Sequence, residues 1–242
     1  MTRQSRQPNE LRPIEIVRGF TRAAAGSVLI RAGRTQVLCT ASITEGVPAW
    51  REGSGRGWVT AEYDMLPGST PDRRARSRMK VDGRAQEIQR LIGRSLRAVV
   101  DTAALGPNTV QLDCDVLEAD GGTRTTAITG AYIALCDAMA AGRRRGLWST
   151  QPVTAGVAAV SVGIVGGEVL LDLDYSEDAA ADVDCNLVAT DAGRWIEVQA
   201  TGERTTYSDE ELTQMLALGR HGMERLFELQ RAALAQPLAE EV

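Results

Sequence analysis

The sequence has little of several residue types that enzymes commonly use. It contains one histidine and one lysine among 242 residues, and only 4% of its residues are aromatic. The histidine, His221, stands within a helical apolar pattern where a surface or packing role is expected, so catalysis by a Ser–His or Cys–His pair has little support. The four cysteines are far apart and form no C-x-x-C pair, which argues against a disulfide framework and a zinc site.

Long apolar runs are also absent. No stretch approaches the length of a membrane span, and the N-terminal residues lack the apolar core of a secretion signal. We therefore expect a cytoplasmic protein with no membrane partner. The hydrophobic content of 43% is nevertheless enough for a compact core that needs no disulfides.

Positive charge is scarce overall but concentrated in one segment. The chain has a net charge of −5, yet nine basic and three acidic residues between positions 70 and 100 give that segment a charge of +6. The stretch 68–78 has no apolar periodicity, which predicts a mobile basic loop. A basic patch on an acidic body suits a polyanionic partner such as a nucleic acid.

The apolar patterns predict an α+β fold of two units, residues 1–150 and 151–242. In the first unit, residues 1–12 are expected to be loose. Alternating runs then predict an antiparallel meander of strands at 14–20, 26–31, 36–43 and 58–66. An amphipathic helix over 88–100, with Asp82 as its cap, and an apolar strand over 109–117 follow, and a second helix completes this unit.

The second unit repeats the order of strands followed by a helix. After a connector at 143–152, strand patterns occupy 153–165, 168–175, 183–190 and 194–201. The run from Ser208 to Glu211 has the form of a capping box and predicts the start of a long helix.

The most informative stretch is Asp120–Thr126, which reads D-G-G-T-R-T-T between the apolar strand and the second helix. The first turn of a helix leaves backbone N–H groups unpaired, and Gly121 and Gly122 let an anion approach them. Thr123 and Arg124 add a hydroxyl and a bidentate cation. The stretch predicts a phosphate site, although a glycine turn before a capped helix explains it as well when taken alone.

A second informative stretch is the acidic segment from Asp172 to Asp184. Carboxylates on a loop between strands suit a hard divalent cation such as Mg²⁺, and Asp178 and Asp184 are the candidate ligands. A solvated turn between two strands is the alternative. An anion site, a cation site and a basic loop together indicate phosphoryl or nucleotidyl transfer on a nucleic acid.

Eight ordered motifs lie between residues 11 and 199. They are L-R-P (11–13), V-L-C-T-A-S (37–42), G-W-V-T-A-E-Y (57–63), G-R with E-I-Q-R-L-I-G-R (83–94), D-C-D (113–115), D-G-G-T-R (120–124), L-D-L-D-Y (171–175) and D-C-N (184–186). Together they resemble the bacterial ribonuclease PH family of phosphorolytic exoribonucleases.

This resemblance implies two similar β-α halves of the ribosomal protein S5 domain 2 type, with mixed or antiparallel sheets packed with helices. It also implies a 3′-to-5′ exoribonuclease that trims tRNA precursors and other structured RNA 3′ ends, uses inorganic phosphate as co-substrate and releases nucleoside diphosphates. The implied assembly is a homohexamer, a trimer of dimers, and the implied cofactor is Mg²⁺ or Mn²⁺.

The resemblance also assigns roles to residues of this chain. Its phosphate-binding positions fall on Arg84, Gly122, Thr123 and Arg124, and its metal-binding carboxylates on Asp178 and Asp184. Arg84, Arg124 and these two aspartates form the expected catalytic set. The RNA-gripping basic loop corresponds to Arg73, Arg74, Arg76 and Arg78.

One motif departs from the family pattern, and two other functions stay open. The family usually has G-T-A-E-G after Gln199, whereas this chain reads Ala200-Thr201-Gly202-Glu203-Arg204, which changes where the backbone is free to adopt unusual angles. A catalytically silent ring subunit that binds RNA is one alternative, and a small-nucleotide phosphotransferase is another. The catalytic hypothesis requires the anion site and the aspartate pair, which are far apart in sequence, to lie together.

Overall fold

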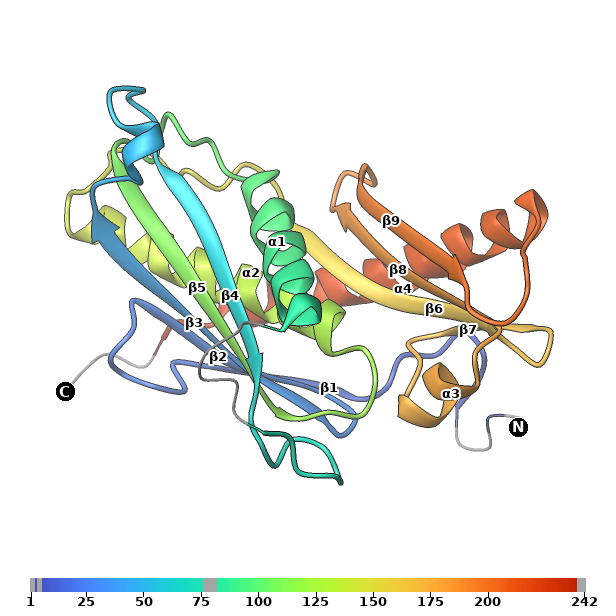
Figure 1. Ribbon diagram of the computed structural model, residues 1–242. Helices are drawn as coiled ribbons and strands as arrows, with labels where there is room; N and C mark the ends of the chain where they lie inside the picture. Colours follow the sequence, from blue (N-terminus) through green and yellow to red (C-terminus); the bar gives the residue numbers. More distant parts are fainter. Residues whose placement is uncertain (1–2, 4–5, 76–81, 239–242) are drawn as a thin grey trace.

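The protein consists of two β-sheets with helices packed between and behind them (Figure 1). The computed structural model describes residues 3, 6–75 and 82–238. The larger sheet uses residues 14–118 and the smaller one residues 157–202, so the predicted α+β fold of strands followed by helices, twice, is confirmed. The division of the chain at residues 150 and 151 stays a prediction.

The larger sheet has five strands in the order β1-β2-β3-β5-β4. They are β1 (Ile14–Arg18), β2 (Gly26–Ala32), β3 (Thr35–Glu45), β4 (Trp58–Met65) and β5 (Asn108–Glu118). A 3₁₀ turn, η1 (Ala49–Arg51), lies between β3 and β4. Helix α1 (Gly83–Arg97) packs on β4, and α2 (Thr123–Arg144) packs on β2, β3 and β5.

The predicted antiparallel meander is wrong for its fourth strand. β1, β2 and β3 are antiparallel neighbours, but β5 lies between β3 and β4, and β4 runs parallel to β5. The crossover from β4 to β5 passes through α1, which covers one face of the sheet. The alternation of apolar residues indicates that a strand exists but says nothing about which strand it pairs with.

The smaller sheet is antiparallel throughout, in the order β7-β6-β8-β9. Its strands are β6 (Val157–Val165), β7 (Glu168–Leu171), β8 (Val183–Thr190) and β9 (Trp195–Gly202), with α3 (Tyr175–Ala180) between β7 and β8. Helix α4 (Asp209–Ala235) packs on β6, β7 and β8. Ser208 and Glu211 cap it reciprocally, as predicted.

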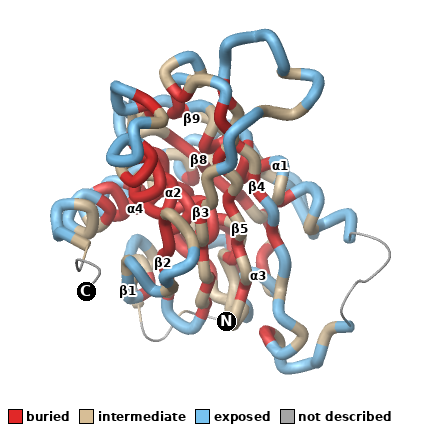
Figure 2. Tube along the Cα trace, turned by 90° about the vertical axis from the view of Figure 1, so that its left-hand side faces the viewer, coloured by how far each residue is buried: buried red, intermediate tan, exposed pale blue. Residues whose placement is uncertain are grey.

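Helix α2 joins the two sheets because it packs on strands of both. Buried residues occupy 17 of its 22 positions, and Figure 2 shows buried residues concentrated along α2 and the neighbouring strands. The fit is close: a side chain at Gly130 would place its Cβ 2.5 Å from Cγ2 of Ile30. No helix among the described residues is both long enough and apolar enough to span a membrane.

The predicted looseness of the N-terminus is wrong for the residues that the structure describes there. Arg3 and Arg6 form ion pairs with Glu177, and the carbonyl of Pro8 accepts a hydrogen bond from the Leu171 N–H at 2.8 Å. The segment is polar because its arginines are paired with buried carboxylates more than 160 positions away. The composition of a segment does not indicate partners so far away in the sequence.

Candidate active site

The predicted phosphate site lies at the N-terminus of α2. Gly121 and Gly122 both have positive φ angles, +77° and +63°, which a side chain would disfavour. Among the described residues no side chain caps α2, whose first helical residue is Thr123. The unpaired N–H groups of its first turn and the positive end of its dipole therefore remain available to an anion.

The hydroxyl of Thr123 is oriented by Tyr63 of β4. The buried Tyr63 hydroxyl donates a hydrogen bond to Oγ1 of Thr123 at 2.8 Å, and burial raises the pKa of Tyr63, so this donor stays protonated. Because the Thr123 oxygen accepts this bond, its own hydrogen is free to donate to a bound anion. The sequence marked Tyr63 only as part of a motif.

Arg124 is held by residues from two other elements. Its Nη1 donates to Oε1 of Gln199 on β9 at 2.9 Å and to Oε1 of Glu87 on α1 at 3.3 Å. Among the described residues these bonds use Nη1 alone, which leaves Nε and Nη2 for a ligand. Neither Gln199 nor Glu87 was predicted as a site residue, because only the fold brings α1 and β9 to the start of α2.

The acidic segment is not the continuous loop that the sequence predicted, and strand β7 ends at Leu171, four residues early. Asp172 has φ +54°, which ends the strand, and the next residues form the short helix α3. Asp174 and Glu177 cap α3 reciprocally. Asp178 lies on this helix and Asp184 on β8, so the two candidate ligands come from different elements.

Burial raises the pKa of both aspartates, and the charge of Asp178 acts on Asp184. Burial raises the pKa of Asp184 to about 6, and repulsion from Asp178 adds to the rise. Partial desolvation also raises the pKa of Asp178, while the charges of Arg84 and Arg124 oppose that rise. The effect of both arginines on Asp178 means that the four predicted catalytic residues lie within electrostatic reach of one another.

Glu203 is a further carboxylate near this pair. Its charge raises the pKa of both Asp178 and Asp184, and its backbone N–H bonds to the carbonyl of Asp182. Within the described residues no group of three or more His, Cys, Asp or Glu side chains forms a metal cage. Two carboxylates beside an anion site suit a cation that keeps most of its ligands as water and phosphate, as Mg²⁺ does.

The phosphate loop and the acidic segment touch directly. A side chain at Gly121 would place its Cβ 2.6 Å from the carbonyl oxygen of Leu173 and 2.8 Å from the backbone nitrogen of Tyr175. Gly121 is therefore required by close approach as well as by its φ angle. The phosphate loop therefore lies against the segment that leads into α3, the helix of Asp178.

Arg12 connects these two stretches and is itself buried. Its Nη2 lies 2.7 Å from Oδ1 of Asp172, and its backbone N–H and Nε both bond to Oδ2. Its Nη1 donates to the carbonyls of Asp120 and Gly121. Arg12 therefore fixes the phosphate loop of one half against the acidic segment of the other.

The basic loop lies partly outside the described residues. Arg73 is exposed, and Arg74 pairs with Asp82 at 3.3 Å. The Ala119 N–H bonds to the carbonyl of Ser69, which ties the start of the loop to the residues that follow β5. Arg76 and Arg78 lie outside the described residues.

The departure from the family motif after Gln199 fits this fold. Ala200 lies in regular strand β9 opposite Cys185, a position that needs no glycine. At Gly202 a Cβ would lie 2.1 Å from the carbonyl oxygen of Thr205, so the close approach of two backbone segments occurs two residues later. The displaced glycine therefore stands where the backbone requires it.

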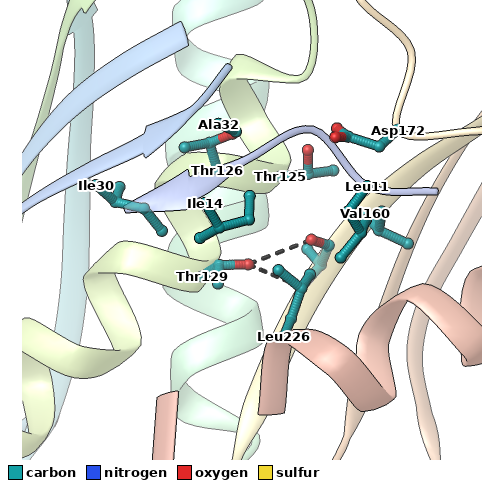
Figure 3. A pocket seen from close by; sticks show the side chains of 11 residues that line it. Leu11, Ile14, Ile30, Ala32, Thr125, Thr126, Thr129, Val160, Asp172 and Leu226 are labelled. Atoms are coloured by element: carbon teal, nitrogen blue, oxygen red, sulfur yellow. Dashed lines mark hydrogen bonds between the residues drawn. The ribbon is translucent and has the colours of Figure 1, made fainter. Parts of the chain in front are cut away.

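A small cavity lies beneath the Arg12–Asp172 contact (Figure 3). Residues from the N-terminal segment, α2, β6 and α4 surround it, and Thr129 bonds there to the backbone of Ala159. Its volume of about 20 Å³ is enough for about one water molecule. The cavity is therefore too small to hold a nucleotide.

Comparison with known proteins agrees with this geometry. Residues 10–141 match the model of domain 1 of the 3′ exoribonuclease family, and residues 156–222 match that of domain 2. The chain belongs to the 3′ exoribonuclease family. It is 57% identical over 235 residues to the ribonuclease PH of Rhodococcus erythropolis, a match that covers 96% of this chain and 90% of the relative.

A second relative of the 3′ exoribonuclease family is equally similar. The ribonuclease PH of Mycolicibacterium smegmatis is 58% identical over 238 residues, which cover 96% of this chain and 91% of the relative. Membership places the chain among the phosphate-dependent exoribonucleases, a class of nucleotidyltransferases.

Solved structures support the fold. Rice Rrp46 has a TM-score of 0.78 at 21% identity, covering 95% of this chain and 98% of its own. A chain of the Archaeoglobus fulgidus exosome with RNA bound to the active site has a TM-score of 0.80 at 22% identity, covering 92% and 90%. At this level of identity the likeness concerns the fold alone.

Proposed function

We propose that this protein trims the 3′ ends of tRNA precursors by phosphorolysis, using Arg84, Arg124, Asp178 and Asp184. The observation that supports the proposal is that Arg124, in the first turn of a helix whose N-terminus no described side chain caps, acts electrostatically on two carboxylates of raised pKa. The family assignment supports phosphate as the attacking group. The arginine loop supports a polyanionic substrate larger than a single nucleotide.

Groups at the start of α2 and at the start of α1 hold inorganic phosphate. The backbone N–H groups after Gly122, the Thr123 hydroxyl and the free Nε and Nη2 of Arg124 supply hydrogen bonds. Arg84 is exposed at the start of α1 and adds a second cation. These groups bind an anion without supplying a nucleophile of their own.

Asp178 and Asp184 are the residues that would hold a divalent cation. Their pKa values are raised first by burial and, at Asp184, also by the charge of Asp178, and a bound cation would favour the ionised form of both carboxylates. When bound, Mg²⁺ or Mn²⁺ would neutralise charge on the scissile phosphate and the departing 3′ oxygen.

The reaction needs no protein nucleophile or general base. An oxygen of inorganic phosphate forms a bond to the last internucleotide phosphorus, and the bond from that phosphorus to the 3′ oxygen breaks. The proton that phosphate carries is available to the departing oxygen. The products are a nucleoside diphosphate and an RNA shortened by one nucleotide. Since an ester is exchanged for an anhydride, excess nucleoside diphosphate would reverse the reaction.

The tRNA precursor is gripped by the basic loop. Arg73 is exposed, Arg74 is partly so, and Arg76 and Arg78 continue the run in sequence. Such contacts bind phosphates irrespective of sequence, so affinity for tRNA should fall steeply with salt. We also propose a cytoplasmic homohexamer arranged as a trimer of dimers. The presence of all four catalytic residues argues against a silent ring subunit.

The reaction is tested with a 3′-extended tRNA in the presence and absence of phosphate. We expect nucleoside diphosphates to appear only when phosphate is present, with stepwise shortening of the 3′ end. Release of nucleoside monophosphates without phosphate would mean hydrolysis and would overturn the proposal. A short oligonucleotide substrate serves as the control for tRNA preference.

A further inference from the structure

The segment before β1 reaches across the molecule to the helix that carries Asp178. Nε of Arg3 bonds to Oε1 of Glu177 at 2.6 Å, and Nη2 bonds to Oε2 at 2.7 Å, which is a bidentate pair. Nη2 of Arg3 also donates to the carbonyl of Leu171 at 2.8 Å. Arg6 adds a third bond to the same carboxylate at 3.3 Å.

These charged groups are removed from solvent. The exposed fraction of the side chain is 4% for Arg3 and 10% for Arg6 and for Glu177. A charge in such a place is stable only when it is paired, and the removal of one partner leaves the other unpaired. The contacts are therefore part of the folded structure, unlike a surface ion pair, which contributes little.

Helix α3 contributes little buried surface of its own. It is six residues long, and its one buried residue is Glu177. A helix this short is unstable in isolation. Ala180 at its end packs against the buried Leu173 and Ala181, and Nη2 of Arg204 donates to the carbonyl of Ala179 at 2.7 Å. The reciprocal caps of Asp174 and Glu177 define where it starts, and Arg3 and Arg6 attach the Glu177 side chain to the N-terminal segment.

The attached residue is the direct neighbour of the candidate metal ligand. Glu177 is bonded to Arg3 and Arg6, while the next residue, Asp178, is exposed and lies within electrostatic range of Arg84, Arg124 and Asp184. The position of Asp178 therefore depends on where the Glu177 carboxylate is held.

We propose that Arg3 and Arg6 are positioning residues that act through Glu177 to hold Asp178 where it shares a divalent cation with Asp184. The inference rests on the proposed metal site. It gives the N-terminal segment a specific role in cation binding, separate from phosphate binding, which depends on Arg84, Arg124 and the N-terminus of α2.

The test measures Mn²⁺ binding to the full chain by electron paramagnetic resonance, a readout that needs no substrate and no turnover. Arg3→Gln is expected to raise the Mn²⁺ dissociation constant about tenfold, as supporting residues of metal ligands commonly do. Glu177→Gln is expected to act similarly, and Arg3→Lys to restore part of the affinity. The KM for phosphate is expected to stay near the wild-type value in all three.

Arg18→Gln is the matched control. Arg18 forms another largely buried pair, with Asp137, and also bonds to carbonyls at the end of α4, but it does not contact α3. Its loss is expected to lower the melting temperature without changing Mn²⁺ affinity. An effect on Mn²⁺ affinity as large as that of Arg3→Gln would mean that general destabilisation is responsible, and would overturn the inference.

Asp184→Asn distinguishes a failure of the proposed metal site from a failure of the positioning role. If the wild type and Asp184→Asn bind Mn²⁺ equally, the proposed metal site is wrong. If Asp184→Asn loses binding while Arg3→Gln and Glu177→Gln keep wild-type affinity, the metal site stands and the positioning role is wrong. Should Arg3→Gln fail to fold, Glu177→Gln and Arg3→Lys decide by the same measurement.

Discussion

The anion side of the site, with Thr123 and Arg124, and the cation side, with Asp178 and Asp184, are supported in different ways. Thr123 and Arg124 begin a helix of 22 residues, 17 of which are buried against two sheets. Asp178 lies on a helix of six residues, one of which is buried. Helix α2 is fixed by the hydrophobic core, whereas α3 depends largely on polar contacts with distant segments of the chain.

This difference indicates which binding step is easier to disturb. A group on a rigid, packed element keeps its position when a single contact is lost, whereas a group on a short, exposed element does not. We expect phosphate binding to change chiefly when a residue that touches phosphate changes. Cation binding should respond to changes at a distance.

The largest expected effect comes from the anion side. Arg124→Ala removes a cation that stabilises the attacking phosphate and the transition state, so kcat/KM for phosphorolysis should fall about 10²–10³-fold. The melting temperature and the affinity for tRNA should change little, since the basic loop is separate. Phosphate-dependent trimming at the wild-type rate would remove Arg124 from the mechanism.

The second prediction concerns Asp184, whose ionised form is disfavoured first by burial and then by the charge of Asp178. The pKa of Asp184 is about 6 in the folded protein against an ordinary value of 3.8. The folded state thus binds this proton more tightly than the unfolded state, and metal-free protein loses stability as pH rises from about 4 to about 6.

Asp184→Asn removes that loss of stability. In EDTA at pH 7.5 the variant should have a free energy of unfolding about 2 kcal/mol higher than the wild type, measured with urea, and the gain should disappear at pH 4. Mg²⁺ should stabilise the wild type and leave the variant unchanged. A variant less stable than wild type in EDTA at pH 7.5 would mean that burial and the Asp178 charge do not destabilise the ionised Asp184.

The smallest effect is expected at the contact between Gln199 of β9 and Arg124. Gln199→Ala removes the bond at 2.9 Å that β9 gives to Arg124, and the KM for phosphate should rise about tenfold while kcat changes less. Glu197→Ala is the control, because Glu197 lies on the same strand and pairs with Arg94 of α1 on the surface. Equal effects of both substitutions would show that β9 as a whole matters, not this bond.

The anion side could be predicted from the sequence because its signals are local. Two glycines between an apolar strand and a helical pattern predicted the start of α2, and the caps at Asp82 and Ser208 are also confirmed. Each of these signals lies within a few residues of the feature that it predicts, because capping groups bond to N–H groups in the first turn of the same helix.

The cation side was harder to predict because its support comes from distant residues. The capping pair Asp174 and Glu177 was a local signal for α3 that went unrecognised. The partners of Glu177 and Asp172 lie near the N-terminus, and the sequence alone does not indicate such pairing. The position of β4 beside β5 was missed for the same reason.

The buried contact between Arg12 and Asp172 has a consequence for how the chain unfolds. Arg12 precedes the larger sheet, Asp172 follows β7 of the smaller one, and either charge alone would be left without its counter-ion in a low-dielectric interior. Unfolding one half thus penalises the other, so denaturation should occur as a single cooperative transition. For the same reason, neither half expressed as a separate fragment should be fully stable.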